Sequence, residues 1–160
     1  MTSVGIGLGA NLGDRKANLA EAIMRLKGAG CSDHLLVSGL YETAPIGCPA
    51  GSPDFYNCVV EIETNLSPLK LLDFTQSIEK ELGRPQIRGL NDPRPVDLDL
   101  LYFGKVSLES EHLTLPHPRM NERAFVLLPL REIRPELVPK DKLDKIEGQP
   151  VRRLMDSGWL

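Results

Sequence analysis

The sequence has few cysteines and no long apolar run. Its three cysteines, Cys31, Cys48 and Cys58, show no Cys-x-x-Cys spacing, which argues against a disulfide framework or a zinc site and favours a reducing cytoplasm. No segment approaches the ~18 apolar residues of a membrane span, and the first residues lack the basic and apolar regions of a signal peptide. We therefore expect a cytoplasmic protein that has no membrane partner.

Aromatic residues are also scarce, and neither sign of charge dominates. Aromatics make up 5% of the chain and the net charge is −3, so a nucleic-acid partner is not expected. A P-loop, Gly-x-x-x-x-Gly-Lys-Ser/Thr, is absent. The pattern Gly5-x-Gly7-x-x-Ala10 matches the dinucleotide fingerprint, but only four residues precede it. These glycines are instead predicted to mark close backbone approach within a strand.

What remains is the composition of an ordinary globular protein. The chain has 160 residues, of which 41% are hydrophobic and 26% charged. That length suggests a single domain spanning residues 1–160, and we expect it to act as a monomer.

Hydrophobic spacing predicts alternating strands and helices along the first two thirds of the chain. Four strands are predicted, at Val4–Ala10, Leu35–Tyr41, Phe55–Thr64 and Val96–Phe103. A first helix includes Leu19 to Leu26, and a second begins at Ser67-Pro68 and ends before Gly83. The order β-α-β-β-α-β predicts an α+β, ferredoxin-like core, in which an antiparallel sheet carries its helices on one face.

The last third forms a C-terminal extension of short helices and strands. Leu113–Leu115 is predicted as a short strand, and Asn121 as the cap of a helix running to Leu128. Four prolines are expected to divide the rest into short pieces, at positions 129, 135, 139 and 150.

Two aspartates in the fourth predicted strand are candidate metal ligands. In Val96-Asp97-Leu98-Asp99-Leu100, strand alternation places the apolar residues on one face and both carboxylates on the other. Carboxylates this close demand a cation or a raised pKa, and Mg²⁺ takes one or two carboxylates together with phosphate oxygens. The alternative is that the aspartates form the solvated face of a half-exposed strand.

Basic residues on either side of this strand favour a phosphate ligand. The segment 84–94 carries Arg84, Arg88 and Arg94 against Asp92, and arginine forks suit phosphate oxygens. A second group, His117, Arg119 and Arg123, follows the strand. The alternatives are a solvated charge run for the arginines and a surface or capping role for His117. Carboxylates beside cationic groups are the usual components of phosphoryl transfer.

With these residues in place, the chain resembles the 6-hydroxymethyl-7,8-dihydropterin pyrophosphokinases of folate biosynthesis. The resemblance runs nearly end to end through short pieces in the same order: Gly9-Ala-Asn-Leu-Gly13, Tyr41-Glu-Thr-Ala-Pro-Ile-Gly47, Asp54-Phe-Tyr-Asn57, Gln76-x-x-Glu79, Gly83-Arg84, Pro93-Arg-Pro-Val-Asp-Leu-Asp99, Leu115-Pro-His117 and Asn121-Glu-Arg-Ala-Phe125. It implies transfer of pyrophosphate from ATP to the pterin hydroxymethyl oxygen, with release of AMP and with two magnesium ions. Departures from the family pattern occur at Leu90-Asn91-Asp92, His112 and Pro118.

The resemblance also implies a role for individual residues. Asp97 and Asp99 match metal ligands, and Arg84 and Arg94 act with them in catalysis. The implied pterin pocket consists of Thr43, Ile46, Phe55, Asn57 and Phe125. The implied ATP contacts are Gln76, Glu79, Arg94, Leu100, Thr114, His117 and Arg123. Without the resemblance, the two phenylalanines suit ordinary core packing, and Gln76 and Glu79 suit an exposed helix face.

Two rival functions remain open. An RNA-binding module on a ferredoxin-like fold would need basic and aromatic residues on the sheet face, which the composition does not favour. A metal-dependent phosphohydrolase would use the same aspartates with water as the nucleophile. Residues 44–53 and 84–94 are rich in proline, glycine or arginine, and we expect them to act as lids that exclude water.

Overall fold

The computed structural model describes residues 1–44, 50–83 and 95–160. Its main sheet has the strand order β5-β1-β4-β3-β8, with β2 also paired to β4, and all of these pairings are antiparallel. The strands are β1 (Thr2–Ala10), β2 (Leu35–Val37), β3 (Leu40–Thr43), β4 (Phe55–Thr64), β5 (Asp97–Phe103) and β8 (Val151–Met155). This arrangement confirms the predicted α+β fold.

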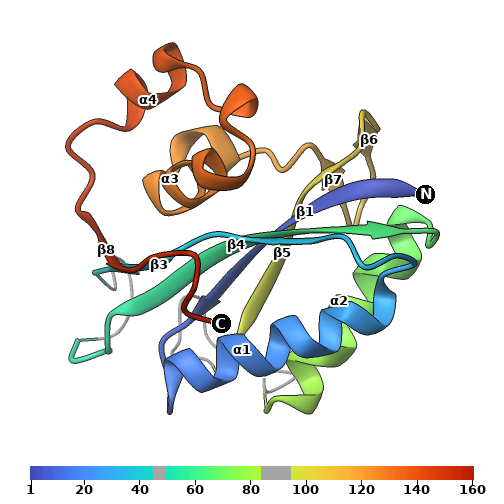
Figure 1. Cartoon of the computed structure of the whole chain (residues 1–160), viewed down its shortest axis with the longest axis horizontal. Coiled ribbons are helices and arrows are strands. Elements are labelled where there is room, and N and C mark those ends of the chain that lie inside the picture. Colours follow the sequence, from blue (N-terminus) through green and yellow to red (C-terminus); the bar gives the residue numbers. More distant parts are fainter. Residues whose placement is uncertain (45–49, 84–94) are drawn as a thin grey trace.

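Helices cover both faces of the sheet. Helices α1 (Arg15–Leu26) and α2 (Pro68–Glu81) lie side by side on one face, as predicted for a ferredoxin-like core, while α3 (Ala124–Ile133) covers the opposite face (Figure 1). The remaining elements are short: the 3-10 turns η1 (Lys27–Ala29), η2 (Met120–Glu122) and η3 (Pro135–Leu137), the helix α4 (Lys140–Ile146), and the hairpin of β6 (Leu108–Glu109) with β7 (Thr114–Leu115).

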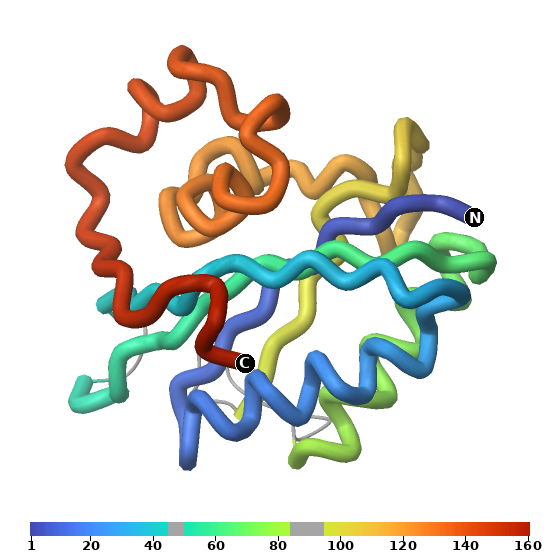
Figure 2. The backbone as a smooth tube through the Cα atoms, viewed as in Figure 1, coloured from blue at the N-terminus to red at the C-terminus, as the bar shows by residue number. Residues whose placement is uncertain are grey.

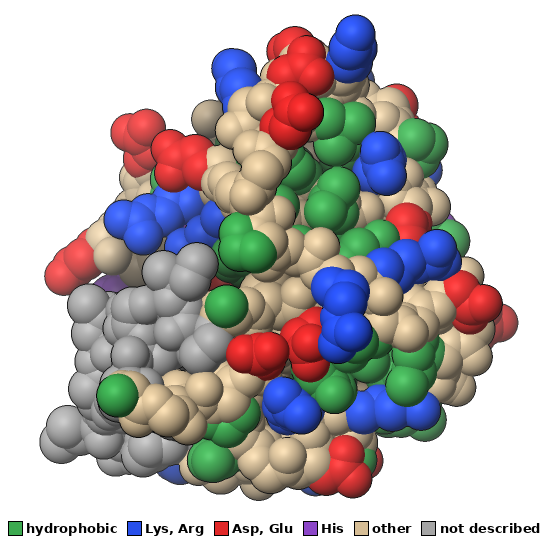
Figure 3. Space-filling model, turned by 90° about the vertical axis from the view of Figure 1, so that its left-hand side faces the viewer, with side chains coloured by type: hydrophobic (Ala, Val, Ile, Leu, Met, Phe, Trp, Pro, Cys, Tyr) green, Lys and Arg blue, Asp and Glu red, His purple; other side chains and the backbone are tan. Residues whose placement is uncertain are grey.

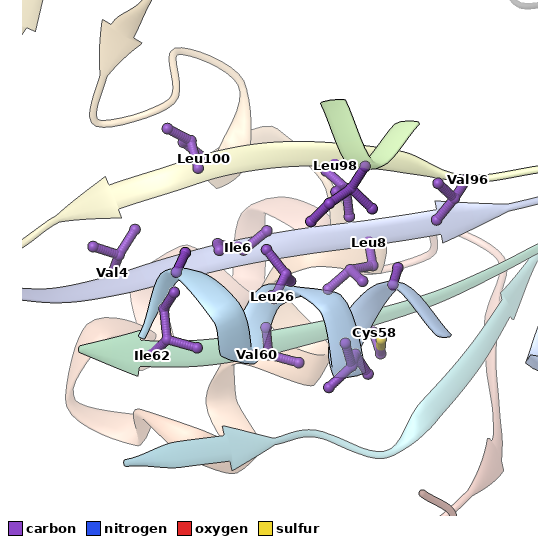
Figure 4. Close-up of a cluster of buried hydrophobic side chains, with 14 of the residues drawn as sticks. Val4, Ile6, Leu8, Leu26, Cys58, Val60, Ile62, Val96, Leu98 and Leu100 are labelled. Atoms are coloured by element: carbon purple, nitrogen blue, oxygen red, sulfur yellow. The ribbon is translucent and has the colours of Figure 1, made fainter. Parts of the chain in front are cut away.

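The main core lies between the sheet and helices α1 and α2. Alternate residues of the central strands point into it, as Figure 4 shows for Ile6 of β1, Val60 of β4 and Leu98 of β5. These side chains are at most 6% exposed. Asp97 and Asp99 therefore face the other side of the sheet, because side chains alternate along a strand.

A bulge in β5 changes that alternation. Gly5 pairs with Tyr102 and Ile6 with Leu100, so Leu101 is an extra residue. Leu101 and Tyr102 consequently both face α3, and Phe103 returns to the main core. Strict alternation would have put Phe103 on the same face as the aspartates.

The predicted strand Leu35–Tyr41 is wrong as a single element. The structure divides it into β2 and β3 at Ser38-Gly39. Ser38 is fully buried, and it bonds to Val59 through both its backbone N–H and its side-chain oxygen, at 2.9 Å each. The interruption persists because the serine hydroxyl satisfies the backbone group that a regular ladder would pair.

The C-terminal predictions need further corrections. Arg123, not Asn121, is the N-cap of α3, and the helix runs to Ile133 rather than Leu128. Pro129 is buried inside α3, and the helix continues past it to Ile133. Strand β8 was not predicted. Figure 2 shows how the C-terminal segment, in red, returns to the sheet edge formed by β3.

No helix among the described residues is both long and apolar enough to cross a membrane.

Candidate functional site

A cavity of about 670 Å³ lies on the α3 side of the sheet and extends around β5 to α2. Most of the predicted site residues line it, although they come from five different elements and the segments between them. Those residues are Thr43, Phe55, Asn57, Gln76, Glu79, Asp97, Asp99, His117, Arg123 and Phe125. The fold therefore gathers into one space residues that are spread over more than eighty positions of the chain.

Glycines of β1 form the floor of this cavity. Gly7 and Gly9 both line it, and a Cβ at Gly9 would lie 3.2 Å from the Asn57 Oδ1 atom. A Cβ at Gly5 would lie 2.2 Å from the ring of Tyr102. The prediction of close approach within a strand is confirmed for Gly5 but not for Gly7, where a Cβ would lie an ordinary 3.5 Å from the Leu101 side chain. The resemblance of these glycines to a dinucleotide fingerprint has no structural counterpart, because they lie within the antiparallel strand β1.

The two aspartates lie half-buried on the cavity side of β5. Val96, Leu98 and Leu100 occupy the main core behind them, which confirms the division of faces. Across residues 1–44, 50–83 and 95–160, no three His, Cys, Asp or Glu side chains gather closely enough to hold a metal ion. Two carboxylates facing one cavity still fit magnesium, which retains waters and accepts phosphate oxygens from a substrate.

Helix α2 supports the strand between the aspartates. Glu79 is buried, and its Oε2 atom accepts a hydrogen bond from the backbone N–H of Leu98 at 2.8 Å. This bond ties the edge strand β5 to α2, so the alternative of an exposed helix face is wrong for Glu79. Gln76, one turn earlier, is exposed at the cavity margin.

His117 is held beside the aspartates by backbone contacts. The backbone N–H of His117 donates to the backbone carbonyl of Leu101 at 2.8 Å, and the ring Nδ1 atom accepts from the backbone N–H of Arg119 at 3.1 Å. Burial lowers the pKa of His117, and Arg123 and Arg119 lower it further, although Asp99 acts in the opposite direction. Because Nδ1 is an acceptor, the neutral ring carries its proton on Nε2 and can donate a hydrogen bond from that atom.

The other half of the cavity is aromatic and amide-lined. The Nδ2 atom of the buried Asn57 donates to Thr43 Oγ1 at 3.0 Å, which orients the amide. Phe55 and Phe125 both line the cavity and are only partly buried. Phe125 also packs against the hydrophobic cluster around α3, so it combines core packing with a place in the cavity wall. The Arg123 guanidinium lies over the Phe125 ring, 5.4 Å from its centroid, and so links the aromatic half to the charged half.

Some predicted residues lie elsewhere. The Leu100 side chain is 3% exposed in the main core, so only its backbone remains for a ligand contact. Thr114 pairs with Glu109 in the β6–β7 hairpin and is not among the residues that line the cavity. Ile46, Arg84 and Arg94 lie outside the described residues.

The sequence did not reveal one wall of the cavity. Gln149, Pro150 and Val151 line it, at the point where β8 joins β3. No local pattern marks these residues as functional. Tertiary contacts such as the pairing of Val151 with Thr43 bring them to the site.

Comparisons with known proteins identify one family. Residues 5–135 match the model of the family described as 7,8-dihydro-6-hydroxymethylpterin-pyrophosphokinase. A 2-amino-4-hydroxy-6-hydroxymethyldihydropteridine pyrophosphokinase of Bacillus subtilis is 46% identical over 129 residues, which cover 80% of this chain and 75% of the relative. The protein of the same name from Haemophilus influenzae is 41% identical over 86% of this chain and 85% of its own length.

Solved structures share the fold at lower sequence identity. The Plasmodium falciparum HPPK-DHPS structure with SDX-DHP superposes with a TM-score of 0.62 at 17% identity and covers 85% of this chain. A crystal structure of HPPK-DHPS in complex with substrates gives a TM-score of 0.62 at 16% identity over 84% of this chain. This chain spans 40% of the length of each of those two chains.

Proposed function

We propose, because this chain belongs to the 7,8-dihydro-6-hydroxymethylpterin-pyrophosphokinase family, that it transfers pyrophosphate from ATP to 6-hydroxymethyl-7,8-dihydropterin. The products are AMP and the pterin diphosphate, and the step belongs to folate biosynthesis. One observation carries the proposal: a single cavity joins an aromatic, amide-lined half to a half that carries two carboxylates and cationic groups.

The aromatic half is suited to a flat heterocycle. Phe55 and Phe125 are proposed to stack on the two faces of the pterin ring. Asn57 offers both a donor and an acceptor to the amide edge of the ring, and its bond to Thr43 preorganises it. Ile46 is proposed to complete the pocket.

The charged half is suited to a triphosphate. Asp97 and Asp99 are proposed to hold two magnesium ions, which when bound would neutralise charge on the triphosphate. His117 and Arg123 can donate to phosphate oxygens, and Arg84 and Arg94 are proposed to do the same. The nucleotide is further proposed to contact Gln76, Glu79, Thr114 and the backbone of Leu100.

The reaction depends on positioning of the two substrates and on charge stabilisation more than on proton abstraction. The pterin hydroxymethyl oxygen forms a bond to the β-phosphorus, and the bond from the β-phosphorus to the oxygen of the α-phosphate breaks. AMP leaves with that oxygen, and the hydroxyl proton passes to water. His117 and Arg123 stabilise the charge that develops on the transferred and leaving groups.

We further propose that residues 1–160 form one domain that acts as a cytoplasmic monomer and binds neither nucleic acid nor a membrane. Both described cysteines, Cys31 and Cys58, are free thiols, as expected in a reducing compartment. Acidic and basic side chains are interspersed on the face in Figure 3, which does not favour binding to a polyanion.

A product assay tests the function against both rivals. Incubation with ATP and magnesium should yield AMP and the pterin diphosphate only when the pterin is present. Release of ADP and phosphate without the pterin would identify a phosphohydrolase instead. Retention of RNA on a filter at moderate salt would support the RNA-binding alternative, and we expect none.

A further inference from the structure

The C-terminal segment contributes to the cavity although it lies beyond the family match, which ends at residue 135. Strand β8 pairs with β3, and Val151 lies opposite Thr43. This pairing carries Gln149 and Pro150 to the cavity wall, next to the start of α3.

Gln149 binds the first turn of α3 through both ends of its amide. Its Oε1 atom accepts a hydrogen bond from the backbone N–H of Ala124 at 2.9 Å. Its Nε2 atom donates to the backbone carbonyl of Glu122 at 2.9 Å. The two bonds therefore hold the residues on either side of Arg123.

These contacts replace a local helix cap. The first N–H groups of a helix have no partner within the helix, and they are commonly satisfied by the side chain of the N-cap residue. Arg123, the N-cap of α3, makes no such side-chain bond. Gln149 supplies the acceptor from 25 residues further along the chain.

The segment that Gln149 holds carries two residues of the site. Arg123 lies between the two bonded residues, and Phe125 follows immediately; both line the cavity. The far end of α3 is fixed separately, because Arg134 donates to the buried carboxylate of Glu61 at 2.8 Å. Loss of the Gln149 bonds should therefore loosen the start of α3 without detaching the helix.

We infer that Gln149 is a positioning residue, which holds the start of α3 so that Phe125 closes on the pterin ring and Arg123 faces the phosphates. This inference rests on the proposed function for the identity of the ligand. Two observations support this role: the two hydrogen bonds of Gln149, and the position of Arg123 between the two residues that those bonds hold.

The test is Gln149→Ala in the full chain, with pterin affinity measured by calorimetry and turnover measured separately. Loss of two hydrogen bonds should raise the Kd and KM for the pterin about three- to tenfold, and kcat should also fall, because Arg123 is no longer held against the charge that develops on the phosphates. Backbone amide exchange at Ala124 should become faster in the ligand-free variant, because its acceptor is gone.

Two further variants separate positioning from general support. Gln149→Glu keeps an acceptor for Ala124 but loses the donor to Glu122, so its pterin Kd should lie between those of the wild type and Gln149→Ala. Arg152→Ala removes an exposed 2.7 Å hydrogen bond from β8 to Glu42 of β3, and it should leave the pterin Kd unchanged.

Three outcomes would overturn the inference: an unchanged pterin Kd in Gln149→Ala, an equal rise in Arg152→Ala, or unchanged exchange at Ala124. A wild-type protein that binds no pterin would overturn the proposed function alone. In that case the exchange measurement still decides whether Gln149 holds the start of α3.

Discussion

At the scale of single residues, the site depends on which face of a strand each side chain occupies. Asp97 and Asp99 turn toward the cavity because Leu98 and Leu100 fill the core behind them. Their carboxylates share one space and one side of the strand, so a bound cation can interact with both.

Replacing either aspartate with asparagine tests the metal assignment. Asp97→Asn or Asp99→Asn keeps the shape of the side chain but removes its charge, so we expect turnover to fall by about 10²–10³. Turnover at saturating magnesium and circular dichroism should be measured together. Asp73→Asn, at an exposed position of α2, is the matched control. Wild-type turnover in either site variant would show that the pair does not hold the metal.

Asn57 is expected to determine pterin binding. Asn57→Ala removes a buried amide and its bond to Thr43, so the Kd for the pterin should rise about tenfold or more. The Kd for ATP should stay the same, because the charged half of the cavity is untouched. Titration calorimetry with each ligand separates the two effects. Asn65→Ala, at an exposed position just after β4, is the control; equal loss of both ligands would make Asn57 a structural residue.

At the scale of elements, α2 and α3 show two ways in which a helix start is specified. Helix α2 carries its own signals: the Ser67 side chain accepts from Lys70 N–H, Pro68 follows, and Gly83 after the helix has φ +100°. Helix α3 depends on Gln149, which is distant in sequence. The boundaries of α2 were therefore predictable from the sequence, and those of α3 were not.

The cap of α2 can be tested directly. Ser67→Ala leaves the Lys70 N–H without its side-chain acceptor, and the free energy of unfolding should fall by about 1 kcal/mol. Chemical denaturation measures this loss. Ser77→Ala, which removes an exposed hydroxyl bonded to the Phe74 carbonyl within the same helix, should cost clearly less. An equal loss in the two variants would contradict the capping role.

At the scale of the whole molecule, one buried carboxylate connects elements on the α3 side of the sheet. Glu61 of β4 is 1% exposed. It accepts hydrogen bonds from Arg134 after α3 and from Tyr102 of β5, and it lies 2.7 Å from His34 Nε2. Burial alone would raise the pKa of Glu61, but the bonds from Arg134, Tyr102 and His34 outweigh it and lower the pKa from 4.5 to about 2.

This lowered pKa predicts how stability depends on pH. A carboxyl whose pKa is lower in the folded state stabilises the protein above its unfolded pKa and loses that contribution as the pH falls. Glu61 should therefore stabilise the fold fully above about pH 5 and progressively less toward pH 2, by roughly 3 kcal/mol in total. Denaturation in urea across this range gives the profile.

The control for this prediction is a second glutamate of the same strand. Glu61→Gln should flatten the acid limb of the stability profile. Glu63→Gln, which changes a partly exposed residue two positions further along β4, should leave the limb unchanged. A Glu61→Gln variant with the wild-type profile would show that other groups control acid unfolding.

The alternation of strands with α1 and α2, the boundaries of β4, the start of α2 and the facing of Asp97 and Asp99 could be inferred from the sequence. These features depend on neighbouring residues: alternation along a strand, a cap at Ser67, and glycine after a helix. The family resemblance added the residues of the pterin pocket, which no local pattern would have selected.

The tertiary structure alone decided the features that depend on contacts between distant segments. The bulge at Leu101, the interruption at Ser38-Gly39, the burial of Glu79 and the return of Gln149 to the start of α3 all require partners more than ten positions away. Such contacts form only once the sheet has assembled. The aspartate pair was thus visible in the sequence, whereas the wall that completes the cavity was not.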